Sequence, residues 1–294
     1  MTTIFFGGNG FVGKNCSLEA FRPSSEYCDL LDYGSTYYYL KQFKGQEISI
    51  VNAAAYVAGF QFNKSRNVEM LYKNSLIALN LMRAIKELDL ACYYLYVSSV
   101  CGYKDGNDTE DLIFNGEPCE NNYGYGMAKR LGIAATRSLE IDLKDKVKIC
   151  NLIPTNMAGM FDDFSDETSH FIPAIIKKMR RGDPEINVLG NAKNLRDFLY
   201  VGDLGKVIEK CVEKQITGTY NVSSGRQISI SDAVDTIKDV FNYKGKINKT
   251  FYNNPEERKV DNSKLKSVME FNPTPLEENL KKIKEWLDTY VEYT

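Results

Sequence analysis

The first thirteen residues constrain the fold of this chain more than any other segment. Thr3-Ile4-Phe5-Phe6 is an apolar run typical of a buried strand, and it leads directly into Gly7-Gly8-Asn9-Gly10-Phe11-Val12-Gly13. Glycines spaced Gly-x-x-Gly-x-x-Gly after a strand are a variant of the dinucleotide-binding fingerprint, in which a tight turn lets backbone N–H groups approach a pyrophosphate. The alternative is a glycine turn with a structural role only. The residues predicted to bind the dinucleotide here are Gly7, Gly10, Phe11, Val12 and Gly13.

The remainder of the first half alternates short apolar runs with helical patterns, as a parallel sheet covered by helices requires. We expect strands at 48–53, 91–97 and 147–152, helices at 67–88 and 125–143, and a C-terminal helix at 276–293. Pro23 comes only ten positions after Gly13, which predicts an abbreviated second unit. The predicted fold class is α/β: a Rossmann-type doubly wound parallel sheet with a smaller C-terminal α/β substrate region. The expected division is a dinucleotide-binding domain at 1–155 and a substrate-binding region at 156–294. Some strands of the second region could pair with the sheet of the first domain.

Composition excludes several classes of function. The 294 residues carry a net charge of −2, which does not favour nucleic acid or acidic membranes as partners. We expect no membrane span, because no apolar run is long enough, and no signal peptide, because the first strand begins at Thr3. Seven cysteines without metal-ligand spacing indicate a reduced cytoplasmic protein that holds no metal.

Tyr125 and Lys129 form the pair of residues most suggestive of catalysis. Residues four apart lie on the same helical face, so the Lys129 ammonium is expected near the Tyr125 phenol. A nearby cation favours the phenolate and would lower the tyrosine pKa from about 10 toward neutrality. Tyrosine could then exchange a proton with a sugar or alcohol oxygen. The pair gains weight from Ser98-Ser99, which follows an apolar run; the alternative is an ordinary exposed pair.

Together these residues resemble the extended short-chain dehydrogenase/reductase superfamily. Later motifs narrow the resemblance to the GDP-L-fucose synthase family, whose members act on GDP-4-keto-6-deoxy sugars with NADPH, or to a relative that modifies GDP-heptoses. The matching segments cover nearly the whole chain in family order: Asn52-Ala53-Ala54-Ala55-Tyr56-Val57-Ala58-Gly59, Pro154-Thr155-Asn156-Met157-Ala158-Gly159, Ser169-His170-Phe171-Ile172-Pro173-Ala174, Arg196-Asp197-Phe198-Leu199-Tyr200-Val201 and, more weakly, Arg258-Lys259-Val260-Asp261.

The resemblance implies a role for each matching residue. Ser98 would hold the keto oxygen, Tyr125 would protonate it, and Lys129 would lower the tyrosine pKa and hold the nicotinamide ribose. His170, the only histidine, and a cysteine would move protons at C3 and C5. The implied substrate-binding residues are Ser99, Asn156, His170, Arg196 and Lys259, and Ala54 is an implied cofactor contact. A structural ion pair is the alternative for Arg196, and a solvated charge is the alternative for Lys259 and its neighbour Arg258.

The serine loop departs from the family pattern Ser-Ser-Cys-Ile-Tyr-Pro. Without a gap, Val100 occupies the cysteine position, and valine cannot move a proton; with a one-residue insertion, Cys101 occupies it instead. This departure favours a 4-keto reductase with weak or absent epimerase activity. Tyr56 stands where the family commonly has a lysine, which indicates a changed sugar pocket.

The expected cofactor is NADPH. Arg22, Ser24 and Ser25 lie where the ribose is read and could accept a 2′-phosphate, whereas an acid at position 19 or 26 could favour NAD. Asp32 resembles the family's adenine-side acid or is a helix N-cap.

The predicted function is therefore NADPH-dependent reduction at C4 of a GDP-4-keto hexose or heptose by a homodimer whose two long helices pack together. The alternatives are a bifunctional GDP-L-fucose synthase, a nucleotide-sugar 4-epimerase or oxidase with retained NAD, and a non-enzymatic redox sensor on a reductase scaffold.

Overall fold

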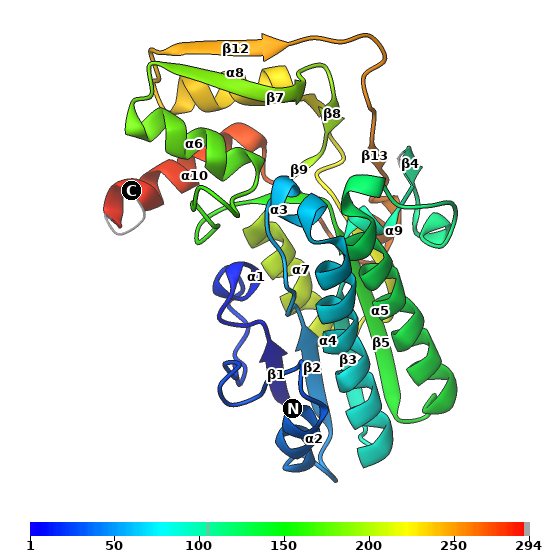
Figure 1. Cartoon of the computed structure of the whole chain (residues 1–294). Coiled ribbons are helices and arrows are strands. Elements are labelled where there is room, and N and C mark those ends of the chain that lie inside the picture. Colours follow the sequence, from blue (N-terminus) through cyan, green and yellow to red (C-terminus); the bar gives the residue numbers. More distant parts are fainter. Residues whose placement is uncertain (105, 291–294) are drawn as a thin grey trace.

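A five-stranded parallel sheet of order β1-β2-β3-β5-β10 forms the base of the molecule (Figure 1). The structure is a computed structural model that describes residues 1–104 and 106–290. The strands of this sheet are β1 (Thr2–Phe6), β2 (Ile48–Asn52), β3 (Cys92–Val97), β5 (Val147–Pro154) and β10 (Gly218–Val222). The predicted fold class, a Rossmann-type parallel sheet with a smaller C-terminal region, is confirmed.

Helices cover both faces of this sheet because its strands alternate apolar side chains between the two faces. Ile4 and Phe6 belong to the core beneath one set of helices, whereas Phe5 belongs to the core beneath the other. The first set comprises α2 (Tyr33–Lys41), α4 (Asn67–Leu88) and α5 (Tyr123–Asp142). The second comprises α1 (Phe11–Lys14), α7 (Val201–Lys214) and α9 (Ser263–Val268).

The abbreviated unit after the glycine turn is present as expected. Helix α1 has only four residues, and in place of a full second strand a single parallel bridge joins Phe21 to Ile4. The backbone of Phe21 donates to Thr3 O at 2.9 Å and accepts from Phe5 N at 2.8 Å. This short connection leaves Arg22 directly beside the turn.

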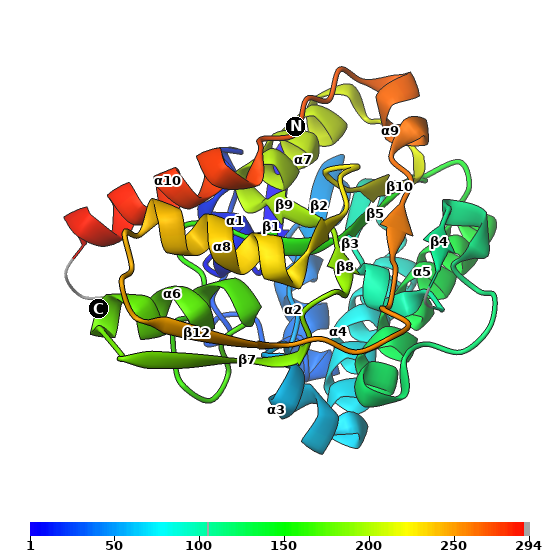
Figure 2. The same cartoon turned by 90° about the horizontal axis from the view of Figure 1, so that it is seen from above.

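The smaller region contains helices and short strands that pack above the sheet. Figure 2 shows α6, α8 and α10 side by side, with β7 and β12 along one edge. The helices are α6 (Phe171–Arg181), α8 (Ile230–Val240) and α10 (Leu276–Thr289). The paired strands are β7 (Glu185–Asn191) with β12 (Lys246–Thr250), β6 (Asn156–Ala158) with β9 (Phe198–Tyr200), β8 (Leu195–Arg196) with β11 (Ile228–Ser229), and β4 (Asn107–Asp108) with β13 (Lys259–Val260).

The C-terminal half returns to the first sheet, since β10 pairs with β5 and α7 packs against the sheet. The domain boundary at residue 155 stays a prediction. Within the described part, none of the helices combines the length and the apolar character that a membrane crossing needs. The seven cysteines are free thiols. Helix α10 ends at Thr289, and residues 291–293 of the expected C-terminal helix lie outside the described residues.

Candidate active site

The glycine turn packs so closely that side chains are excluded from it. Gly7 has φ +76°, and a Cβ on it would lie 2.6 Å from the backbone nitrogen of Ala54. A Cβ on Gly13 would lie 2.2 Å from the carbonyl oxygen of Gly8. Gly10 is the N-cap residue of α1 and donates to Gly7 O at 3.0 Å. The turn therefore follows β1 and packs against the residues at the carboxyl end of β2, and its bare backbone fits the close approach of a pyrophosphate.

Asp32 and Arg22, which the sequence suggested as contacts of the adenine-side ribose, have protein partners in the structure. Asp32 is the N-cap of α2, and its carboxylate accepts a hydrogen bond from Ser35 N at 2.5 Å. The Arg22 guanidinium points into the glycine turn and donates to the carbonyls of Gly8 and Gly13. The N-cap alternative for Asp32 is thus present, and Arg22 has backbone partners.

Tyr125 and Lys129 share the buried face of α5, 8% and 3% exposed. The ammonium lies 5.6 Å from the centroid of the Tyr125 ring and 5.2 Å from that of Tyr96. It donates to the carbonyl oxygen of Val97, at the end of β3, at 2.9 Å. The expected proximity of the phenol and the cation is confirmed.

The expected effect on the tyrosine pKa is wrong for this structure. Burial raises the pKa of Tyr125, the charge of Cys101 raises it further, and a hydrogen bond with the Ser99 side chain lowers it. Burial also lowers the pKa of Lys129 to about 8. The physical reason is desolvation, which opposes the charged form of each group. Tyr125 is therefore a protonated donor at neutral pH rather than an acidic phenol.

The two serines after β3 have different partners. The Ser98 hydroxyl donates to the backbone carbonyl of Lys129 at 3.2 Å, which ties the strand end to α5. The Ser99 hydroxyl accepts from the backbone N–H of Cys101 at 3.2 Å and is the serine that interacts with the Tyr125 phenol. The structure thus brings both serines to the tyrosine helix, with Ser99 next to the phenol.

The 3-10 turn Val100–Gly102 separates the valine from the cysteine. Val100 is 2% exposed and packs with Tyr96 and Tyr103 in a small apolar cluster. Cys101 is partly exposed and interacts electrostatically with both Tyr125 and Lys129. Cys101, rather than Val100, is therefore the residue of this loop that lies near Tyr125 and Lys129.

A glycine and an arginine on α5 hold that turn in place. A Cβ on Gly126 would lie 2.3 Å from the carbonyl oxygen of Cys101, so only glycine permits this approach. Arg130 donates to the carbonyl of Gly102 and, at 2.7 Å, to that of Gly116. The helix that carries Tyr125 thus also positions the thiol.

His170 is on a different segment, at the N-cap of α6, with a side chain 42% exposed. Its Nδ1 lies 3.8 Å from Oδ1 of the buried Asp162. Burial lowers the pKa of His170, but interactions with Asp162 and Asp163 outweigh it, so the pKa is raised overall. The segment just before His170 contacts the loop after β2, where Gly59 N donates to Thr168 O at 2.6 Å.

Of the residues expected to bind substrate, Ser99 follows β3, whereas His170, Asn156, Arg196 and Lys259 lie in the smaller region. Asn156 donates to the carbonyl of Asp197 at 3.1 Å and is exposed. Arg196 pairs with Glu256, so the ion pair left open by the sequence is present. Lys259 is exposed on β13, whereas Arg258 lies 3.2 Å from the buried carboxylate of Asp108.

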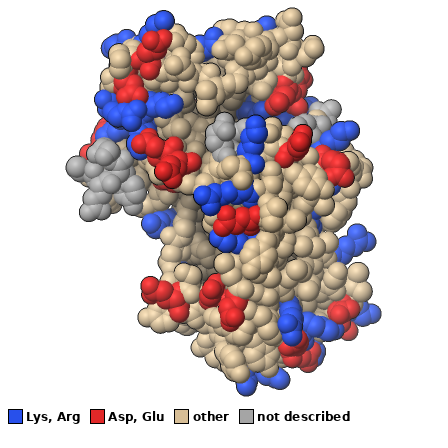
Figure 3. All heavy atoms as spheres, in the orientation of Figure 1, with Lys and Arg blue, Asp and Glu red and all other residues tan. Residues whose placement is uncertain are grey.

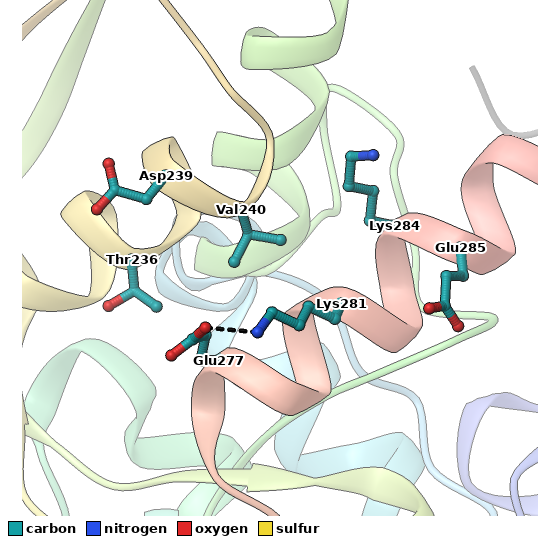
Figure 4. A pocket seen from close by; sticks show the side chains of 7 residues that line it. All are labelled: Thr236, Asp239, Val240, Glu277, Lys281, Lys284 and Glu285. Carbon is teal, nitrogen blue, oxygen red and sulfur yellow. Dashed lines mark hydrogen bonds and ion pairs between the residues drawn. The ribbon is translucent and has the colours of Figure 1, made fainter.

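The space-filling view shows a face hollowed between the smaller region and the sheet, with charged side chains gathered over the start of α4 (Figure 3). A separate open pocket of about 550 Å³ lies between α8 and α10 (Figure 4). The pocket of Figure 4 contains none of the predicted site residues, and Glu277 and Lys281 form an ion pair in it at 2.6 Å. We therefore place the candidate site at the carboxyl end of the sheet.

Sequence reasoning missed Asp162, Gly126 and Arg130. Asp162 could have been predicted from the two adjacent acids at 162 and 163, the first of which lies eight residues before His170. The arginine carried no motif, because its partners are backbone carbonyls that only the fold brings to it.

Comparison with known proteins agrees with this arrangement. The model of the NAD dependent epimerase/dehydratase family matches residues 6–223. A GDP-L-colitose synthase of Yersinia pseudotuberculosis is 31% identical over 263 residues, covering 83% of each chain. A GDP-L-fucose synthase of Dictyostelium discoideum is 28% identical over 313 aligned positions, covering 98% of this chain and 96% of that protein.

Among solved structures, a GDP-6-OMe-4-keto-L-xylo-heptose reductase from C. jejuni has the same fold, with a TM-score of 0.85, 17% identity and 98% of each chain covered. The long match to the family model and the 31% identity to a curated relative decide the assignment. The chain belongs to the NAD dependent epimerase/dehydratase family, as a GDP-L-fucose synthase-like oxidoreductase that uses a nicotinamide dinucleotide.

Proposed function

We propose that this enzyme reduces the C4 keto group of a GDP-linked deoxyhexose or heptose with NADPH. The observation that carries the proposal is the buried pair of Tyr125 and Lys129, with Ser99 next to the phenol, at the same end of the sheet as the glycine turn. The sequence relatives are named as synthases of GDP-L-colitose and GDP-L-fucose. Structural neighbours are named as reductases of GDP-heptoses, which supports the same class of substrate.

When bound, the dinucleotide supplies a hydride to C4. Tyr125 donates its phenolic proton to the oxygen that becomes a hydroxyl, since its pKa keeps it protonated until then. Lys129 stabilises the phenolate that remains, and the Ser99 hydroxyl orients the phenol. Ser98 holds the strand end against α5 and can also hydrogen-bond the keto oxygen.

NADPH, rather than NADH, is the proposed cofactor. Solved structures of the same fold include a GDP-L-fucose synthetase bound to NADP and a GDP-mannoheptose C4 reductase with NADP bound. In this chain the glycine turn and Ala54 are the proposed dinucleotide contacts, and Lys129 is the proposed partner of the nicotinamide ribose. Asn156, Arg196 and Lys259 are the proposed contacts of the nucleotide sugar.

Retained proton exchange at C3 or C5 is a second candidate function, and the position of Cys101 favours it. Cys101 is partly exposed and interacts electrostatically with both Tyr125 and Lys129, whereas Val100 is buried in an apolar cluster. Cys101 would remove a proton next to the keto group, and His170 would return one. This candidate revises the sequence-based expectation of weak or absent epimerisation, which depended on the register of the serine loop.

One experiment tests both parts. Candidate GDP-4-keto hexoses and heptoses are incubated with NADPH in deuterated water, and NADPH oxidation and deuterium at C3, C4 and C5 are measured. We expect oxidation only with a 4-keto substrate, and a loss of about 10²- to 10⁴-fold in Tyr125→Phe. Full turnover in that variant contradicts the proposed proton donor.

The cysteine is tested in the same assay. Cys101→Ala should abolish deuterium at C3 and C5 while reduction continues. Cys119→Ala is the matched control, because Cys119 is an exposed thiol outside the serine loop. Deuterium at neither carbon in the wild type contradicts the second candidate and leaves reduction alone.

We also propose a homodimer formed through α4 and α5. Val68 and Tyr72 on α4 and Ile141 on α5 are large apolar side chains that are well exposed. Val68 and Tyr72 lie in the first two turns of α4 and Ile141 in the last turn of α5, and the two helices pack against each other, so a second copy could cover these side chains in a four-helix bundle. Sedimentation of the wild type as a dimer and of Tyr72→Glu as a monomer is the expected result; a monomeric wild type contradicts it.

A further inference from the structure

The side chain of Arg22 is bound by four backbone carbonyls around the glycine turn. Nη1 donates to Gly8 O at 3.1 Å and to Gly13 O at 2.6 Å. Nη2 donates to Cys16 O at 2.7 Å and to Leu18 O at 3.0 Å. One guanidinium therefore connects the first part of the turn, the end of α1 and the segment that follows it.

Other contacts hold the guanidinium, the stem and the backbone of Arg22. Its central carbon lies 5.3 Å from the centroid of the Phe5 ring, on the second residue before the turn. The backbone of the neighbouring Phe21 is bridged to β1, and the carbonyl of Arg22 accepts from Asn9 Nδ2 at 3.2 Å. A Cβ on Gly8 would lie 2.7 Å from the Arg22 side chain, so the turn and the arginine are closely packed. The position of Arg22 is thus set by the same residues that form the turn.

We propose that Arg22 is a positioning residue for the dinucleotide and does not read the ribose 2′-phosphate, although it follows the abbreviated second strand where that group is read. The inference rests on the proposed dinucleotide cofactor. By binding the carbonyls of Gly8 and Gly13, the guanidinium holds the turn in its observed shape, and it places a positive charge beside the turn that is proposed to receive the pyrophosphate. This contribution is the same for NADPH and for NADH.

The test separates positioning from phosphate recognition by measuring the dissociation constants of both dinucleotides. Arg22→Met removes all four hydrogen bonds, and Arg22→Lys keeps the charge but loses the planar fork that reaches them. We expect Kd to rise by about tenfold or more for NADPH and for NADH alike, with the ratio of the two unchanged within about twofold. Arg22→Lys serves if the methionine variant does not fold.

Tyr243→Phe is the matched control for a purely structural loss. Its hydroxyl donates to Asp183 O at 2.6 Å in the smaller region, so the variant should melt earlier yet bind both dinucleotides as the wild type does. A loss confined to NADPH in the Arg22 variants overturns the inference, as does an unchanged Kd for both dinucleotides. A wild-type protein that binds neither dinucleotide instead refutes the proposed cofactor, and the inference with it.

Discussion

Replacing Lys129 with methionine should stabilise the protein at neutral pH while abolishing its reductase activity. The ammonium is 3% exposed, and burial lowers its pKa from 10.5 to about 8. A shift of this size means that the charged form costs about 3 kcal/mol in the folded state. The hydrogen bond to Val97 O, at 2.9 Å, returns about 1.5 kcal/mol. Methionine has a similar volume and no charge, so we expect a net gain of about 2 kcal/mol at pH 7.

The pH dependence gives the sharper result. Because the folded pKa of Lys129 lies below the unfolded one, the full penalty is present below about pH 8 and disappears as the pH rises through 10.5. Between pH 7 and pH 10 the wild type should therefore gain about 2.5 kcal/mol relative to Lys129→Met. Urea unfolding of the two proteins without dinucleotide, at steps across this range, measures the difference directly.

Lys146→Met is the control, since Lys146 is an exposed lysine paired with Asp89. Its stability difference from the wild type should stay within about 0.5 kcal/mol at pH 7 and change little up to pH 10. The contrary result is a Lys129→Met variant that is less stable than the wild type at pH 7, by the same amount up to pH 10. Burial of the ammonium would then not reduce the free energy of unfolding. The reasoning that assigns its charge to catalysis rather than to folding would then be refuted.

Two further results are expected. Gly13→Ala should cost at least about 3 kcal/mol of stability and abolish dinucleotide binding, because the new methyl group would lie 2.2 Å from Gly8 O. Gly45→Ala, at φ +84° with open space around it, should cost only about 1 kcal/mol in the same urea titration, and equal losses would contradict the packing argument. Asp162→Asn should lower the pKa of His170, since the Asp162 carboxylate raises it against the effect of burial, and proton donation by the imidazole should then fall off at lower pH. His170 is the single histidine, so an NMR titration of its ring protons measures this shift, and an unchanged titration would count against the pairing.

Much of the fold followed from local pattern. The helix expected at 67–88 has those bounds, and the expected strands differ from the observed ones by one or two residues at their ends. These elements could be predicted because apolar periodicity reports which face of an element is buried. The short strands of the smaller region could not, since two- and three-residue strands such as β8 and β6 depend on partners far away in the chain.

The candidate site was predictable in its residue types and less so in its electrostatics. The i, i+4 spacing placed Tyr125 and Lys129 together, as observed. Spacing carries no information on burial, so the direction of the tyrosine pKa was wrong. The register of Val100 and Cys101 also depended on a 3-10 turn that packs on Gly126, a contact between two segments 25 residues apart.

The sequence alone determined that an N-terminal strand would lead into a glycine turn and that Tyr125 and Lys129 would share one face of a helix, because each of these signals lies within a few neighbouring residues. Only the tertiary structure decided that Cys101 lies near Tyr125 while Val100 is buried, that Asp162 faces His170, and that Arg22 holds the turn. These three outcomes depend on hydrogen bonds and burial between segments distant in sequence. Such interactions are set by the packing of the sheet and its helices, which no local pattern records.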